Sequence, residues 1–523
     1  MSHPKGPRSQ TRVFDRRQIL TGGAAMMGAG VVGSAYSPVR AAFVRDTPAV
    51  VQGARRSEQI RAENAKPGTT DWLLTRTRRG YHETYGKGWD VRTGVQGFAS
   101  HMSIKAGETL RFFVSAEPAD EYRLDIFRMG YYGGAGGRLI RTFNGLKGTP
   151  QPMPRDGEHA IQECRWQEAV SLQVPESWLS GVYLGKLSTA RTNADAFIVF
   201  IVRDTREADL IFQCSDFTWQ SYNRWPRWRS MYDGPTGPWV SRRPDSYSAG
   251  FGRPYAIYWN GFPAGFEAQS NGSGEFLLWE LPLAFWLEQE GYDVTYISNL
   301  DTHEDAAGLL RGRAWLSVGH DEYWTLELYN NVLAARDAGV HLAFLSGNSV
   351  SGRIALLTGS DGRPHRGIRW VPGPLDATEL MGARSYGVGF GDWICAAPDH
   401  WIFESTGMRK GDFVRQLVGW EFHGHPVAAQ HKDLVVLAEG PVRGFRGEAS
   451  ERRFATTLYS APKGNLVFNA ATCWWNMVLA APPGHAVPPF LPERDLTRFH
   501  EGDDRVRRIT RNLLDRMIAT RVR

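Results

Sequence analysis

His320, Asp321, Glu322 and Tyr323 stand side by side in the segment SVGHDEYWT, residues 317–325, directly behind the apolar run AWLSV. Imidazole and carboxylate groups move protons near neutral pH, and both bind metal ions. A phenol has a pKa of about 10 when free, but a bound cation can force its deprotonation. The segment therefore predicts proton transfer by His320 or Glu322, or metal binding through Tyr323. Helix capping by His320 and Glu322, with Tyr323 packed in the core, is the structural alternative.

A second group with metal-binding chemistry occurs in LVGWEFHGHP, residues 417–426. If this segment is extended, Glu421, His423 and His425 share one face, because side chains in a strand repeat every second residue. Carboxylate and imidazole ligands suit iron, zinc or manganese. Gly424 and Pro426 indicate that the strand ends here, which would leave one histidine facing solvent.

The segment DFTWQSYNRWPRWRSMYDGP, residues 216–235, follows a predicted strand and is rich in aromatic residues. Its polar side chains could orient a substrate; they are Asp216, Tyr222, Asn223 and Arg224. The alternative is a loop between glycine and proline residues, packed by its tryptophans.

These groups need elements that bring them together. From about residue 207, buried strands alternate with helices, as in ADLIFQCS, GEFLLWELPLAFWLEQEG, DVTYIS, AWLSVG, LELYNNVLAARDAG and VHLAFLSG. This succession predicts a mostly parallel sheet with helices on its faces, in which ligands gather at the carboxyl ends of the strands. SVGHDEYWT begins where one such strand ends, so its polar residues are expected to line that crevice.

The rest of the chain divides around this α/β domain, which is predicted to span 206–523 and to end in a helix, DDRVRRITRNLLDRMIATRV. Residues 78–205 contain short alternating runs without helical stretches, which favours an antiparallel β-sandwich. Residues 43–77 are polar with little periodicity and are interpreted as a linker or surface arm.

Residues 1–42 have the pattern of a twin-arginine signal peptide: Arg16 and Arg17 are adjacent, a Gly/Ala-rich stretch follows, and Val39-Arg40-Ala41 offers a cleavage site. A membrane anchor is the alternative, but the apolar stretch is short for a span. We expect a periplasmic or secreted protein with no membrane contact after cleavage. The leader holds six basic residues and one acidic residue, leaving 55 basic against 54 acidic residues. A near-neutral mature chain does not suggest nucleic-acid binding.

The four cysteines lie far apart without C-x-x-C spacing, which argues against a structural zinc site. Buried thiols are expected, with one disulfide left open. A G-x-G-x-x-G segment after a strand, typical of dinucleotide enzymes, does not occur.

Several segments, in this order, resemble the large subunit of N,N-dimethylformamidase and its relatives: LDIFRMGYYGGAGGR, TWQSYNRW, SVGHDEYW, LVGWEF and LVFNAATCWWN. The resemblance implies a β-sandwich followed by an α/β domain similar to glutamine amidotransferase folds. It also implies a ferric ion held by two tyrosinates and a glutamate, which hydrolyses a small amide. Carried over by motif, Tyr323 matches one tyrosine and Glu421 matches the glutamate.

The sequence departs from that family at the second tyrosine. Ser351 and Gly352 in GNSVSGR stand where an aromatic pair is expected, and a serine hydroxyl is a poor ligand for ferric iron. The site then recruits His423, His425 or Tyr222, binds zinc or another divalent metal instead of iron, or has lost its metal.

Together these features predict an exported metal-dependent hydrolase that cleaves an amide C–N bond of a small substrate. His320 or Glu322 would move the proton, while Asn348 and the loop from Asp216 to Arg224 would orient the substrate. The alternative is a binding protein that holds a carbohydrate or another cell-envelope ligand on its 19 tryptophans without turnover. A homo-oligomer or a small partner subunit is compatible with both.

Overall fold

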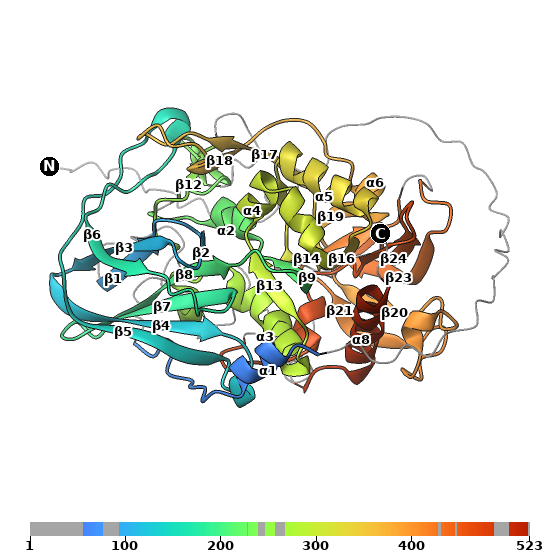
Figure 1. Cartoon of the computed structure of the whole chain (residues 1–523). Helices are drawn as coiled ribbons and strands as arrows, with labels where there is room; N and C mark the ends of the chain where they lie inside the picture. The colour runs from blue at the N-terminus through green and yellow to red at the C-terminus, as the bar shows by residue number, and fades with distance from the viewer. Residues whose placement is uncertain are drawn as a thin grey trace, which may run out of the picture.

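A computed structural model describes residues 56–76, 94–226, 228–238, 246–256, 267–426, 430–444, 447–485 and 501–520. The chain is mixed α/β, with several sheets and with helices between them (Figure 1), which confirms the predicted class. The predicted signal peptide, 1–42, lies outside the described residues. Among the helices that the structure describes, none combines the length and apolar character needed to cross a membrane.

Two sheets in the N-terminal part face each other across a hydrophobic core. One contains β1 (Gly94–Ala99), β3 (Thr109–Glu117) and β6 (Glu168–Gln173); the other contains β2 (Ser103–Lys105), β8 (Asp195–Arg203), β7 (Gly181–Thr189), β4 (Asp120–Met129) and β5 (Gly137–Gly148). Neighbouring strands are antiparallel except β2 and β8, which are parallel. Phe112 and Phe200 meet between the sheets, with ring centroids 5.7 Å apart.

The other face of the five-stranded sheet packs against the α/β part. Leu184 and Phe197 of that face belong to the same core as the α/β strands. The segment interpreted as a linker or surface arm contains α1 (Glu58–Asn64), whose Asn64 amide donates to Glu288 at 2.8 Å. Glu288 also pairs with Arg128 of β4 at 2.7 Å. A continuous core and buried polar contacts therefore join the two parts.

A nine-stranded sheet forms the centre of the α/β part. Its order is β13 (Val294–Ile297), β9 (Ala208–Gln213), β14 (Gly312–His320), β16 (His341–Gly347), β25 (Leu466–Asn469), β24 (Ala449–Ser460), β22 (Glu421–Gly424) and β19 (Arg384–Val388), with β23 (Val435–Arg443) beside β24. The first five strands are parallel and the others antiparallel. Half of the sheet therefore has the predicted parallel arrangement.

Helices lie on both sides of this sheet (Figure 1): α4 (Asn299–Glu304) and α5 (Leu326–Ala338) on one, and α3 (Leu281–Glu290) and α8 (Asp504–Ala519) on the other. As predicted, α5 ends at Gly339, which has a φ of +106°. The helix predicted over 274–291 begins instead with a π-helical turn, Phe276–Glu280. The predicted loop after β9 begins with a short helix, α2 (Asp216–Tyr222).

Smaller elements lie outside this sheet. They are β15 (Tyr323–Trp324), β17 (Gly352–Leu357), β18 (Gly367–Trp370) and β12 (Ala249–Gly250) in one sheet, the pairs β10 (Asp233–Gly234) with β11 (Gly237–Pro238) and β20 (Gly391–Ile394) with β21 (Phe413–Val418), and the helix α6 (Ala377–Met381). Among them, β15 lies within the segment SVGHDEYWT, residues 317–325.

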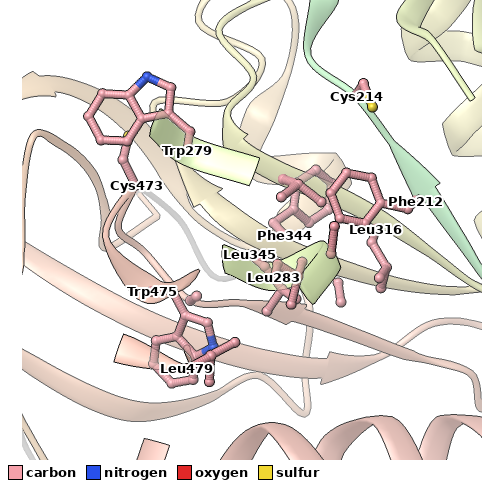
Figure 2. Packing of buried hydrophobic residues seen from close by; sticks show 14 of the residues in the cluster. Phe212, Cys214, Trp279, Leu283, Leu316, Phe344, Leu345, Cys473, Trp475 and Leu479 are labelled. Carbon is pink, nitrogen blue, oxygen red and sulfur yellow. The ribbon is translucent and has the colours of Figure 1, made fainter. Parts of the chain in front are cut away.

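Large apolar side chains from neighbouring strands pack together in the core of the α/β part (Figure 2). Phe212, Leu316 and Phe344 come from β9, β14 and β16, and Leu283 of α3 packs beside them. Interiors packed in this way move little, so the polar residues that follow each strand start from fixed positions. All four cysteines are free thiols, and three of them are buried as expected, whereas Cys164 is partly exposed.

Candidate metal centre

His320, Glu322 and Glu421 form a buried group at the carboxyl edge of the sheet. One ligand atom from each lies within 4.8 Å of the other two. The Nε2 atom of His320 is 2.6 Å from Oε2 of Glu421 and 3.5 Å from Oε2 of Glu322. His320 ends β14, and Glu421 begins β22 in the antiparallel half. The motifs SVGHDEYW and LVGWEF, about a hundred residues apart in the chain, therefore meet, as the family resemblance implied.

The backbone around this group is shaped by two glycines. Gly319 has a φ of +71°, a conformation that side-chain-bearing residues rarely adopt, and it turns the chain out of β14. At Gly347, a Cβ atom would lie 2.3 Å from the carbonyl oxygen of Glu421. The end of β16 can therefore approach β22 only without a side chain at residue 347. The Thr218 hydroxyl of α2 then accepts the N–H of Glu322 at 3.0 Å.

Three phenols extend the group on the side of Glu322. The hydroxyl of Tyr222 donates to Oε2 of Glu322 at 2.7 Å. The hydroxyl of Tyr232 donates to Tyr222 at 2.7 Å and accepts from Tyr323 at 2.6 Å. It also lies 3.2 Å from Oε2 of Glu322. Tyr323, Tyr232 and Tyr222 thus form a hydrogen-bonded chain that ends on a carboxylate.

Tyr232 was not among the predicted site residues. It lies in the 216–235 segment, but its spacing does not distinguish it from the other aromatic residues there. Only the fold of that segment, with Tyr222 and Tyr232 stacked at a centroid distance of 4.6 Å, brings it to Tyr323.

Ser351 and Gly352 lie beside Tyr323 because β15 pairs with β17. A Cβ at residue 352 would be 2.6 Å from the ring of Tyr323, so glycine leaves the room that this ring occupies. The backbone N–H of Ser351 donates to the carbonyl of Glu322 at 3.1 Å. The phenol that accompanies Tyr323 comes from Tyr232 rather than from this segment.

The electrostatics of the group centre on His320. Burial opposes a charge on this imidazole, but Glu421 and Glu275 raise its pKa well above the usual value. Within the described residues, neither ring nitrogen makes a hydrogen bond of acceptable geometry, although Nε2 faces two carboxylate oxygens. A buried imidazole and two carboxylates that converge on one point form a donor set that fits a cation. The three residues could therefore hold a metal ion.

Asn348, predicted to orient a substrate, lies beside the group. Its amide nitrogen donates to Oε2 of Glu421 at 2.8 Å, and its Oδ1 has no hydrogen-bond partner among the described residues. It is buried with a φ of +52°, in the left-handed region that asparagine tolerates better than most residues. An unpartnered, buried acceptor beside the carboxylate is suited to receive a hydrogen bond from a ligand.

The structure does not bring His423 and His425 into the group, which corrects the predicted ligand set. Nε2 of His423 accepts the N–H of Ser349 at 2.8 Å, and its Nδ1 lies 2.6 Å from Oδ1 of Asn469. Both nitrogens are therefore engaged, and burial lowers the pKa of His423 to about 4. His425 lies past the end of β22, is half-exposed and pairs with Glu439 at 3.0 Å.

Three of the predicted substrate-binding residues have structural partners instead. Asp216 accepts the N–H of Asn299 at 2.6 Å and faces a separate cavity of about 280 Å³ between β8, α2 and α4. Asn223 accepts the N–H of Trp225 at 3.1 Å, and Arg224 pairs with Asp233 at 3.0 Å. Of the four, Tyr222 is the one that contacts the buried group.

Asp321 stands between His320 and Glu322 in the sequence but faces the sheet. It accepts hydrogen bonds from Ser317 of β14, from Gln213 at the end of β9 and from Asn299 at the start of α4. Burial raises its pKa to about 6. We assign it to the framework that holds the strand ends together.

Comparison with known proteins identifies the family of the chain. No curated protein matches the chain closely enough to be informative. The pattern of one protein family matches residues 123–487, more than two thirds of the chain, and this stretch contains every residue of the buried group. The chain belongs to the N,N-dimethylformamidase beta subunit-like, C-terminal family.

Proposed function

We propose that this protein is a metal-dependent hydrolase of small amides, similar to N,N-dimethylformamidase. The observation that carries the proposal is the buried convergence of His320, Glu322 and Glu421, with phenols on one side. On the other side lies Oδ1 of Asn348, which has no hydrogen-bond partner within the described part of the chain. Membership of the family supports the same reaction class. The overall reaction consumes one water and converts an amide into a carboxylic acid and an amine.

His320, Glu322 and Glu421 would hold the ion, and the phenols of Tyr232 and Tyr323 are the nearest further donors. Phenol and carboxylate oxygens favour ferric iron; an imidazole with two carboxylates also suits zinc. A cation at this position supplies Lewis acidity toward a carbonyl oxygen and makes a bound water more acidic.

The chain's own residues supply orientation and proton transfer. Asn348 would accept a hydrogen bond from a substrate or water at its unpartnered Oδ1. Burial, Glu322 and the neighbouring phenols raise the pKa of Tyr222 well above its usual value, so this hydroxyl stays protonated. The hydrogen bonds from Tyr232 to Tyr222 and from Tyr222 to Glu322 can pass a proton to and from Glu322.

Elemental analysis combined with visible absorption tests the proposal. Purified, untagged protein is expected to carry close to one iron or zinc per chain and to release formate and dimethylamine from N,N-dimethylformamide or a related amide. Tyrosinate bound to ferric iron absorbs in the visible, so Tyr323→Phe should weaken or remove such a band. A metal-free protein that releases a carbohydrate or envelope ligand unchanged would instead support the binding function.

We further propose export by the twin-arginine pathway. We also propose that an N-terminal β-sandwich precedes an α/β domain of the glutamine amidotransferase type, and that the protein assembles with a small subunit. The sequence pattern of residues 1–42 supports export. Fusion of these residues to a reporter should direct it out of the cytoplasm, and replacement of Arg16 and Arg17 by lysine should retain it there.

A further inference from the structure

Glu275 lies next to the buried group, although nothing in its sequence context indicates a role. It is fully buried and immediately precedes the π-helical turn, Phe276–Glu280. Its Oε2 atom accepts the indole N–H of Trp279 at 2.8 Å and lies 3.7 Å from Nδ1 of His320. Its Oε1 has no hydrogen-bond partner among the described residues. Leaving an oxygen of a buried carboxylate unsatisfied is unfavourable, which indicates that Glu275 has a specific role.

The π-helical turn and His320 are packed directly against each other. A Cβ atom at Gly319 would lie 2.5 Å from Cβ of Trp279, which means that the turn touches the backbone just before His320. The rings of Trp279 and His320 meet edge to face at 6.2 Å. π-helical turns inside helices often occur at functional sites. Here the turn sends Glu275 toward His320 and Glu280 away from it.

His320 therefore has carboxylates on both sides of its ring. Glu275 faces Nδ1, while Glu421 and Glu322 face Nε2. Histidines that bind metals usually donate their other ring N–H to a carboxylate, which fixes the tautomer and the ring orientation. Hydrogen bonds of this kind are often long before the ligand is bound.

We infer that Glu275 is a positioning residue that holds the Nδ1–H of His320 and thereby directs Nε2 toward Glu421 and Glu322. This inference rests on the proposed function, in which His320 holds the metal ion. Glu275 touches neither substrate nor ion; it acts through the histidine.

The test compares Glu275→Gln with Glu280→Gln. Glu280 is a matched control because it is equally buried, ends the same π-helical turn and bonds to Ser215 and Trp219 instead of His320. We expect Glu275→Gln to weaken iron or zinc affinity by about 10- to 100-fold in a chelator competition, as is typical of outer partners of metal-binding histidines. Glu280→Gln should leave that affinity unchanged.

A second measurement does not depend on metal. In protein labelled with ¹⁵N-histidine, the ring-nitrogen signals of His320, assigned by their loss in His320→Gln, report which nitrogen carries the proton. Glu275→Gln should shift these signals, and Glu280→Gln should not. If Glu275→Gln does not fold, the same measurements are made on Glu275→Asp. This variant keeps the carboxylate but moves it away from His320 by the length of one methylene.

Unchanged affinity and unchanged signals in a folded Glu275 variant would overturn the inference, and so would equal losses in the Glu280 variant. If wild-type protein binds no metal and hydrolyses no amide, the proposed function fails, while the histidine signals still decide whether Glu275 positions His320.

Discussion

The parallel and antiparallel halves of the nine-stranded sheet contribute to the same buried group in different ways. In the parallel half, β14 is buried along its length and delivers His320 at its carboxyl end, where such sheets collect ligands. In the antiparallel half, β22 has four residues and delivers Glu421 at its first position. The difference shows that strand direction predicts where the site residues lie in the parallel half of the sheet but not in the antiparallel half.

Side-chain alternation illustrates the limit in the antiparallel half. Glu421 and His423 do face the same turn after β16, since they contact Asn348 and Ser349 in succession. Yet both ring nitrogens of His423 already have hydrogen-bond partners, Ser349 and Asn469, and the strand has ended before His425. Alternation placed the residues on one side, but it did not reveal which of them had partners already.

The largest effect is expected at Glu421. Glu421→Ala removes a carboxylate that lies 2.6 Å from His320 and leaves that buried imidazole without its nearest counter-charge. Since loss of an outer partner alone weakens metal binding by about 10- to 100-fold, loss of this group should reduce metal affinity and amide hydrolysis by more than about 100-fold. Metal content and kcat/KM measure this. Full metal occupancy in a folded variant would remove Glu421 from the centre.

Asp216 follows β9 and lies outside the buried group, whereas His320 and Glu322 at the end of β14 belong to it. Burial raises the pKa of Asp216 to about 8, whereas the unfolded chain releases the proton near pH 4. Between these values the unfolded state binds fewer protons, so the free energy of unfolding should fall as pH rises, by at most about 1.4 kcal/mol per pH unit.

Asp216→Asn removes this titration. Urea unfolding at about pH 5 and about pH 8 should show a smaller loss of stability in the variant than in wild type. Equal losses in both proteins would show that Asp216 is ionised in the fold.

His423 should contribute to stability rather than to metal binding. His423→Ala leaves the N–H of Ser349 without its acceptor and removes one hydrogen bond of the Asn469 side chain, which should lower the free energy of unfolding by about 1–3 kcal/mol. Metal content per folded chain should stay at the wild-type value. A selective loss of metal with unchanged stability would restore His423 to the ligand set.

The smallest effect is expected at His425. It is half-exposed and its partner Glu439 is also partly exposed, so His425→Ala should change stability by less than about 0.5 kcal/mol. Activity and metal content should not change. A clear loss of either would mean that the end of β22 approaches the centre more closely than the structure shows.

The sequence by itself determined the mixed α/β class, the ends of α5, and the place of His320, Glu322 and Asn348 behind parallel strands. These features depend on local periodicity, on glycine at a helix end and on the rule for strand ends, all of which act within short windows of the chain. The family assignment also followed from short motifs in a fixed order.

Only the tertiary structure decided which polar residues meet. Tyr232 reaches Tyr323 because the 216–235 segment folds back on itself, and Glu275 reaches His320 through a π-helical turn that the helical pattern did not indicate. His423 is occupied by Asn469, which lies on another strand. Hydrogen-bond partners distant in sequence compete for each buried polar group, and the outcome of that competition is set by packing rather than by spacing.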